Sequence, residues 1–314
     1  GETRQPQGWK VRPAPTLRTG GFLVEAYEYL KKQQQTVEDR ETLQTETLYG
    51  TEKKPMPYLL GMMNLLLHGI EYPNLVRANT LSIPLHEISD RQRYDVIITN
   101  PPFGGEEEAG IQASFPEGTR TSETALLFLQ FIMRSLRRSK GDRSGGRCAM
   151  VLPNGPLFAT GVAARIKQDL VENFNLHTIV RLPNGIFAPY TSIPTNLLFF
   201  QRDGPTEEIW YYELPLPKGR KNYTKTKPLR FVEFDECCQL WNERPETEHS
   251  WRVRVEEVVN NGYNLDLKNP SSLEALVHRP PAELLQSIVA KEKQILELTQ
   301  AIDRSLSFRG NQGA

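Results

Sequence analysis

Residues 94–104 of this 314-residue chain read YDVIITNPPFG, and this stretch decides the fold. The run from Asp95 to Thr99 is apolar and β-branched enough to form a buried strand. It ends abruptly in a polar residue, Asn100, which two prolines and an aromatic residue follow. Open α/β folds bind their ligands at the carboxyl ends of the strands, so the Asn100 side chain is expected at a ligand site.

The residues after this strand suit an exocyclic amine as the bound group. Proline has no backbone donor, so Pro101 and Pro102 leave carbonyl oxygens as hydrogen-bond acceptors. The N6 amine of adenine is a poor nucleophile because its lone pair is delocalised into the ring. The Asn100 side-chain oxygen and the Pro101 carbonyl could each accept one N–H bond from it, and Phe103 would stack on a base flipped out of the duplex. A proline-rich turn after a core strand is the alternative interpretation.

Apolar runs alternate with helical patterns through most of the chain, which is typical of a parallel sheet wrapped by helices. The sequence predicts five strands, at residues 95–99, 147–152, 176–182, 195–201 and 208–213. Helices are predicted at residues 21–35, 56–68, 123–136 and 162–173.

The character of the sequence changes after Phe231, where strand-like runs stop. An extended connector is expected at residues 264–270, and a helix from Pro281 to about Arg304. This helix carries apolar residues in a heptad pattern, namely Leu284, Ile288, Ile295, Leu298 and Ile302. Such a helix either binds a partner subunit or docks on its own domain. We expect a methyltransferase-like α/β domain at residues 1–230 and a C-terminal extension at residues 231–314.

Composition excludes several classes of protein. No apolar run approaches the roughly 20 residues that span a bilayer, and no signal peptide is evident, so a cytoplasmic protein is expected. The three cysteines make no disulfide framework or metal site, and none follows a proline at a strand end, as a cytosine C5 nucleophile would. Charge is balanced, with 38 basic and 38 acidic residues, so non-specific DNA binding gains nothing from net charge. The basic stretch from Arg134 to Arg147 is interpreted as a solvated loop in preference to a phosphate-binding patch.

Asn100-Pro101-Pro102-Phe103 is the signature of amino-methyltransferases, and other segments extend the resemblance. Thr19-Gly20-Gly21-Phe22-Leu23 is similar to the end of the glycine-rich cofactor loop usually written Asp-Pro-Ala-Cys-Gly-Thr-Gly-Gly-Phe-Leu. Tyr49-Gly50-Thr51-Glu52 resembles a second cofactor motif, in which the acidic residue takes the ribose hydroxyls; without that context, Glu52 would be read as a surface ion pair with the lysines that follow it. Ala78-Asn79-Thr80-Leu81 resembles a Gly-Asn-Thr-Leu segment near the cofactor adenine, although Asn-Thr is also ordinary turn chemistry.

From about Thr19 to about Ser305, the chain resembles the modification (M) subunit of type I restriction-modification systems, within the N6-adenine DNA methylase family. Further matches are the segment from Gly145 to Phe158, the Leu-Pro-x-Gly-Ile-Phe loop that ends at Phe187 and lines the target-base side in that family, and Gly262 to Asp266.

The resemblance implies a class I S-adenosylmethionine-dependent methyltransferase fold, a Rossmann-like sheet with a C-terminal helical extension. It implies methyl transfer from S-adenosylmethionine to adenine N6 in DNA, and it implies no metal. The expected catalytic residues are Asn100, Pro101, Pro102 and Phe103. The expected cofactor-binding residues are Thr19, Gly20, Gly21, Phe22, Glu52, Asn79, Thr80 and Leu81. The expected partners are DNA, a specificity subunit that reads the sequence, a second modification subunit and a restriction (nuclease) subunit.

The sequence departs from the family before Thr19. The aspartate, the cysteine and the first glycine of the cofactor loop are missing, and no clean apolar strand precedes the loop. We therefore expect an altered or fragmentary start and weak binding of the cofactor. Two alternative functions remain open: an inactive structural subunit of the same complex, and methylation of a glutamine amide or an RNA base by the same hydrogen-bond chemistry.

Overall fold

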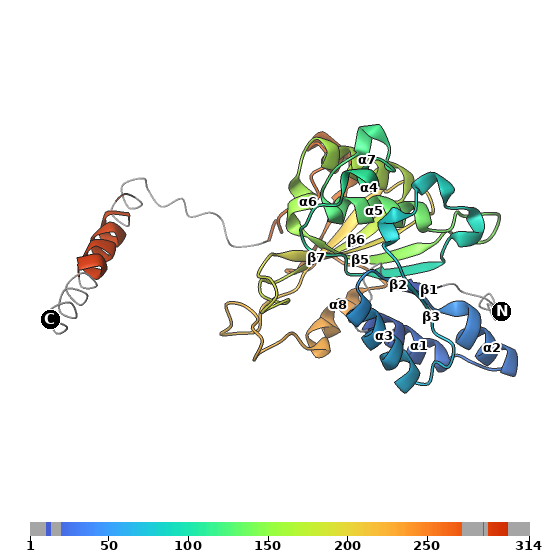
Figure 1. Ribbon diagram of the computed structural model, residues 1–314. Coiled ribbons are helices and arrows are strands. Elements are labelled where there is room, and N and C mark those ends of the chain that lie inside the picture. Colours follow the sequence, from blue (N-terminus) through green and yellow to red (C-terminus); the bar gives the residue numbers. More distant parts are fainter. Residues whose placement is uncertain (1–10, 14–19, 272–284, 286–287, 301–314) are drawn as a thin grey trace, which may run out of the picture. The chain divides into compact units, whose positions relative to one another are not determined.

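The computed structural model describes residues 11–13, 20–271, 285 and 288–300. The chain divides into two compact units, Gly1–Pro270 and Ser271–Ala314 (Figure 1). The first unit contains the α/β architecture that the sequence predicts, but its sheet is mixed and not wholly parallel, because β7 (Thr195–Gln201) and β9 (Ser250–Arg254) pair antiparallel with their neighbours.

A seven-stranded sheet forms the centre of the first unit, in the order β1-β4-β5-β7-β6-β8-β9. These strands are β1 Val11–Pro13, β4 Val96–Thr99, β5 Arg147–Pro153, β6 Asn175–Leu182, β7 Thr195–Gln201, β8 Glu208–Glu213 and β9 Ser250–Arg254. Strands β1, β4, β5, β6 and β8 run in one direction, and β7 and β9 run in the other. A parallel pair, β2 Tyr49–Glu52 and β3 Asn74–Arg77, makes a second sheet, and β2 contacts β1. All five predicted strands are confirmed.

Helices cover both faces of the sheet (Figure 1), with α5 and α7 on one side and α1 and α3 on the other. The longer helices are α1 Gly21–Lys31, α3 Pro55–Leu67, α5 Thr124–Ser135 and α7 Val162–Asn173. Short helices are α2 Val37–Thr42, α4 Ala109–Gln112, α6 Asn154–Phe158, α8 Asp235–Leu240 and α9 Val255–Asn260. A π-helical turn, η1 Leu43–Thr47, and five 3-10 turns complete the described elements: η2 Thr80–Ser82, η3 Leu85–Glu87, η4 Asp90–Gln92, η5 Glu117–Thr119 and η6 Phe231–Phe234.

Apolar burial explains why these helices form on their respective faces. Eleven of the twelve residues of α5 are buried, because this helix belongs to the large core cluster that also contains α7 and the central strands. On the other face, Leu23 of α1 and Leu65 of α3 belong to a second cluster. Burial of an aliphatic side chain contributes about 1.5–3 kcal/mol, so each cluster holds its helices firmly on the sheet.

The structure differs from the sequence predictions at both ends of the sheet. Strand β9 pairs antiparallel with β8, so strands do not stop after Phe231, and the compact unit ends at Pro270, not at residue 230. At the other end, β1 pairs in parallel with β4, although the sequence shows no clean apolar strand there. A three-residue strand is too short to have a recognisable apolar pattern of its own.

The second unit contains a helix over residues 288–300. Ile288, Ile295 and Leu298, three residues of the predicted heptad pattern, lie within this helix. The other two residues of the predicted pattern, Leu284 and Ile302, lie outside the described residues. None of the described helices is long and apolar enough to cross a membrane.

Candidate active site

The Asn-Pro-Pro-Phe segment begins where β4 ends, at the carboxyl edge of the sheet. Thr99 and Pro101 are buried, while Asn100 and Phe103 are half-buried. The loop is fastened to the start of α5, because the Gly105 carbonyl accepts hydrogen bonds from both the backbone N–H (3.3 Å) and the hydroxyl (3.0 Å) of Thr124. The segment is therefore held between a buried strand and a buried helix.

The loop after β6 meets this segment. The rings of Phe103 and Phe187 lie edge to face, with centroids 5.0 Å apart and planes at 71°. Edge-to-face pairs are a favoured aromatic geometry. Phe187 ends the Leu-Pro-x-Gly-Ile-Phe loop, so the structure brings together the two segments that the sequence assigns to the target base.

A polar network that the sequence analysis missed cross-links the neighbouring strands at the same edge. The side chain of Asn154, just after β5, donates to Asp266 (3.0 Å) and accepts a hydrogen bond from Asn196 of β7 (3.1 Å). Asp266 also forms an ion pair with Arg181 of β6, at 2.7 Å. The signal was present in the sequence, since Asn154 and Asp266 both fall in segments that match the family, but only the fold shows that they meet.

The glycines expected at the cofactor lie at the start of α1. Gly20 precedes the helix with φ of 76°, and a Cβ added there would lie 3.4 Å from the Gly61 carbonyl of α3. The distance is an ordinary van der Waals contact, so it is the positive φ that favours glycine at this position. A Cβ on Gly21 would meet nothing within 4 Å, so the space around the first turn of α1 is open. Phe22 is the second residue of the helix and is exposed, and Thr19 lies outside the described residues.

Glu52 is the last residue of β2 and is buried, so the surface ion-pair interpretation is wrong. Its carboxylate accepts a hydrogen bond from the Lys54 backbone N–H at 2.8 Å. Lys53, meanwhile, pairs with Glu107 at 4.0 Å. A carboxylate at a strand end, directly before α3, is the position that the family motif requires.

The segment 78–81 lies beside Glu52, because the Ala78 N–H donates to the Glu52 carbonyl at 3.1 Å. The Asn79 side chain accepts a hydrogen bond from the Leu81 N–H at 3.1 Å, so the expected turn chemistry is present. The Thr80 hydroxyl is buried and has no hydrogen-bond partner among the residues that the structure describes. Leu81 is fully buried in the large core cluster, which favours a packing role for its side chain.

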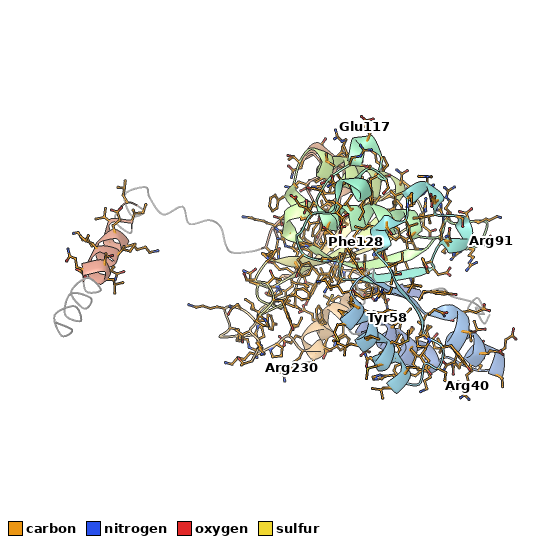
Figure 2. The ribbon with its side chains drawn as sticks, in the orientation of Figure 1. Arg40, Tyr58, Arg91, Glu117, Phe128 and Arg230 are labelled. Atoms are coloured by element: carbon orange, nitrogen blue, oxygen red, sulfur yellow. The ribbon has the colours of Figure 1, made fainter. Side chains whose placement is uncertain are left out.

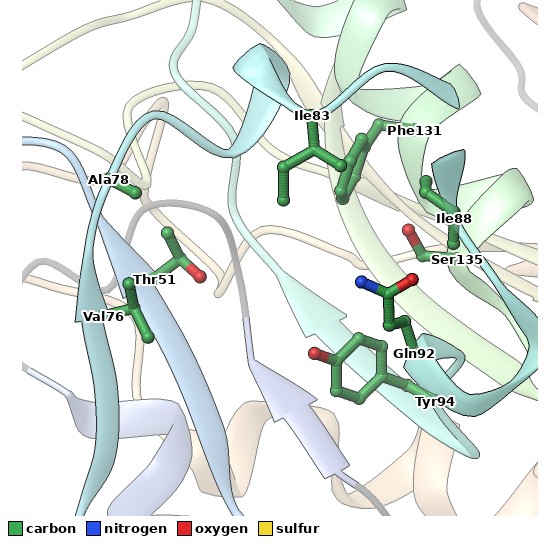
Figure 3. A pocket seen from close by; sticks show the side chains of 9 residues that line it. All are labelled: Thr51, Val76, Ala78, Ile83, Ile88, Gln92, Tyr94, Phe131 and Ser135. Carbon is green, nitrogen blue, oxygen red and sulfur yellow. The ribbon is translucent and has the colours of Figure 1, made fainter. Parts of the chain in front are cut away.

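A cavity of about 200 Å³ lies next to these residues but is not their site (Figure 3). Thr51, Val76 and Ala78 face Tyr94 and other residues across it; the remaining lining residues are Ile83, Ile88, Gln92, Phe131 and Ser135. Tyr94 precedes β4, whereas the ligand edge lies at the other end of that strand. None of the expected cofactor or catalytic residues lines the cavity.

Within the described parts of the chain, no group of three or more His, Cys, Asp or Glu side chains could hold a metal ion. The site therefore offers the amide of Asn100, the carbonyl of Pro101 and the ring of Phe103 at the end of β4. The Glu52 carboxylate at the end of β2 and the first turn of α1 are the further groups expected at the cofactor.

The profile of the family described as N-6 DNA Methylase matches residues 7–278.

The chain belongs to the N-6 DNA methylase family. Among curated members, the EcoEI methylase subunit of Escherichia coli is 47% identical over 311 residues, which cover 96% of this chain and 61% of that subunit. A modification subunit from Vibrio vulnificus YJ016 has a crystal structure with a TM-score of 0.82 and 56% identity, over 87% of this chain and 58% of that one. A chain from a structure of the type I R-M system has a TM-score of 0.80 and 43% identity, over 96% of this chain and 63% of that one. This N-6 DNA methylase family member spans less than two thirds of the length of each of these relatives.

Proposed function

We propose that this chain forms the catalytic part of a type I modification subunit, which transfers a methyl group from S-adenosylmethionine to adenine N6 in DNA. The observation that carries the proposal is the Asn-Pro-Pro-Phe segment at the carboxyl end of β4, with Phe103 against Phe187. The names of the relatives, a methylase subunit and a modification subunit, support the same activity.

The residues present fit S-adenosylmethionine at its ribose and adenine end. Glu52 would accept hydrogen bonds from the ribose hydroxyls, since it is a buried carboxylate at a strand end. The Thr80 hydroxyl, which is buried and has no hydrogen-bond partner among the described residues, and Asn79 would lie near the adenine. The open first turn of α1 at Gly21 would receive the methionine carboxylate, as a helix N-terminus favours an anion. When bound, the cofactor supplies an electrophilic methyl group.

The protein's own groups would activate the substrate amine. The Asn100 side-chain oxygen and the Pro101 carbonyl each accept one N–H bond of adenine N6, which draws its lone pair out of the ring and toward the methyl carbon. With S-adenosylmethionine bound, Asn100 and Pro101 would hold the amine nitrogen while it forms its bond to the methyl carbon, and the electron pair of the broken carbon–sulfur bond would go to sulfur. The methylated nitrogen then releases one proton to water, because neither an amide oxygen nor a peptide carbonyl is a base near neutral pH.

Phe103 and Phe187 would hold the flipped adenine. Stacking of a base on an aromatic ring contributes about 1–3 kcal/mol, which helps offset the cost of unstacking the base from the duplex. A DNA target and relatives from bacteria such as Escherichia coli, whose DNA lies in the cytoplasm, support a cytoplasmic protein.

The partners follow from the same proposal. The chain carries no DNA-reading module that the sequence reveals, so a specificity subunit would read the sequence, with a second modification subunit and a restriction subunit in the same complex. The relative from the type I R-M system comes from work on complex assembly. The exposed Ile288 and Ile295 of the C-terminal helix are suited to such a contact.

Asn100→Ala in the assembled complex tests the proposal. We expect methyl transfer to duplex DNA to fall by about 10²–10³, the loss typical of one catalytic hydrogen-bonding group. Asn242→Ala, which removes an exposed amide elsewhere, should leave the rate unchanged. Full turnover by the Asn100 variant would refute the assignment.

Titration calorimetry separates this function from an inactive structural subunit. We expect weak binding of S-adenosylmethionine by the chain as it stands, since much of the cofactor loop is absent from its sequence. Each lost charge-assisted hydrogen bond weakens binding by about 1.5–3 kcal/mol. No binding at all, even by a chain with the full loop rebuilt ahead of Gly20, would favour the structural subunit, and methylation of a protein or RNA substrate in place of DNA would favour the second alternative.

A further inference from the structure

We propose that the basic loop at residues 214–230, between β8 and η6, binds the DNA backbone next to the flipped base. This inference rests on the proposed function, because it names the surface that holds the substrate of that site.

The loop concentrates positive charge in a chain whose total charge is balanced. Its sequence, LPLPKGRKNYTKTKPLR, contains six basic residues and no acidic one, against 38 of each in the whole chain. The basic residues are Lys218, Arg220, Lys221, Lys225, Lys227 and Arg230. All except Arg220 are exposed. None of the four lysines is in an ion pair with a described residue, so their ammonium groups are available to phosphates.

The loop has internal contacts that hold the lysines in place. Tyr223 is buried, its hydroxyl donates to Glu233, and the Arg220 guanidinium lies over its ring at 5.7 Å. Thr224 and Lys227 exchange backbone hydrogen bonds of 3.3 and 3.1 Å, which closes a tight turn. Lys225 and Lys227 therefore belong to an ordered turn. Binding through them costs less conformational entropy than binding through a flexible segment that must first become ordered.

The loop lies at the edge of the sheet that carries the candidate active site. Strand β8 runs in the same direction as β6 and β4, so all three end at this edge. The Tyr223 N–H donates to the Asn184 carbonyl at 3.1 Å, and a Cβ added to Gly185 would lie only 2.3 Å from the Tyr223 carbonyl. Asn184 and Gly185 belong to the loop whose Phe187 contacts Phe103. The basic loop is thus one packed layer away from the ring proposed to stack on the base.

The other basic stretch, from Arg134 to Arg147, does not compete for this role. Arg137 and Arg143 both bind Asp95, at 2.5 and 3.0 Å, at the amino end of β4. Figure 2 shows Arg91, which precedes β4, and Arg230 on opposite sides of the unit. The structure therefore supports the solvated, structural interpretation of residues 134–147.

Acidic residues complete the charge pattern at the ligand edge. Glu106 and Glu108 are exposed just after the Asn-Pro-Pro-Phe segment and would repel phosphates, whereas Glu107 is paired with Lys53. A duplex whose base enters beside Phe103 is then favoured to run along the β6 and β8 side, over the lysines, because phosphate contacts there are attractive. The charges of this surface therefore favour the DNA backbone as the group that binds to it.

The test compares two variants that each remove two exposed charges spaced two residues apart. Lys225→Gln/Lys227→Gln alters the loop, and Arg138→Gln/Lys140→Gln alters the opposite edge. Fluorescence anisotropy with a random-sequence 30-base-pair duplex measures affinity from 50 to 200 mM salt. We expect the loop variant to reduce the slope of log affinity against log salt by about 1.8, at about 0.9 for each phosphate contact, and to lower affinity at least about tenfold at 0.1 M salt. The control variant should match the unaltered chain.

Equal slopes for the two variants, or tighter binding of an RNA duplex of the same sequence, would overturn the inference. A wrong proposed function would give a different result. Asn100→Ala would then show no loss of methyl transfer, while Lys225→Gln/Lys227→Gln would still reduce the slope of log affinity against log salt.

Discussion

Adding one methyl group at Gly185 should strongly destabilise the loops of the candidate active site. Gly185 lies in the loop after β6 with φ of 81°, and an added Cβ would come within 2.3 Å of the Tyr223 carbonyl oxygen, which cannot move without shifting the basic loop. Gly185→Ala therefore carries two penalties. A left-handed conformation costs a non-glycine residue about 1–2 kcal/mol. Overpacking against a backbone atom adds about 1–3 kcal/mol.

Gly219→Ala is a matched control within the basic loop. Gly219 has the same φ of 81°, but nothing lies within 4 Å of its added Cβ. This variant should lose only the conformational part, about 1–2 kcal/mol. The difference between the two variants isolates the contact between the target-base loop and the basic loop.

Urea unfolding followed by tryptophan fluorescence measures both losses, and limited trypsin digestion reports where they act. We expect Gly185→Ala to lose about 2–5 kcal/mol in the free energy of unfolding and to be cleaved faster within residues 218–227, because the loop separates from its neighbour. Equal losses for the two alanines, or unchanged cleavage, would show that the contact at Tyr223 does not hold the loops together.

Three further predictions address the base, the partner and the pH dependence. Phe103→Trp should retain more methyl transfer than Phe103→Ala, since stacking is worth about 1–3 kcal/mol; equal losses in a methylation assay would remove stacking from the mechanism. Ile295→Asp should release the partner subunit in size-exclusion chromatography without lowering the melting temperature of the chain, and a lower melting temperature would instead mean that the helix stabilises its own chain. Burial, with a smaller contribution from the charge of Arg244, lowers the pKa of His177 from 6.5 to about 4. As pH falls from 6.5 toward 4, the unfolded chain takes up a proton that the folded chain does not, so stability should fall through this window. His177→Gln should flatten that fall in urea midpoints measured at several pH values, and an unchanged slope would exclude His177 as its source.

Much of the fold follows from local patterns in the sequence. A strand such as β4 or β6 is recognisable because its apolar run is long enough to show its period and is bounded by turn residues. The position of Asn100 at a ligand edge follows in the same way, since it is the first polar residue after a buried strand. The heptad in the C-terminal helix is also local, and residues 288–300 are indeed helical.

Short or edge elements could not be predicted so readily. β1 has only three residues, which are too few to show alternation. β9 does alternate, with Trp251 and Val253 buried and Arg252 and Arg254 exposed, but the run is five residues long and stands among polar residues. Each becomes a strand because a neighbouring strand, β4 or β8, offers it backbone hydrogen bonds. That partner is distant along the chain, and propensity alone cannot identify it.

Only the tertiary structure shows which loops contact one another at the candidate site. The basic run at residues 218–227 is visible in the sequence, yet nothing there shows that Tyr223 packs on Gly185 and so reaches the loop of Phe187. The sequence by itself determines which residues carry amide, aromatic and positive groups, because each is a property of one residue and its neighbours. Which of these groups share one edge depends on strand order and direction, and these depend on burying residues far apart in the chain within a common core.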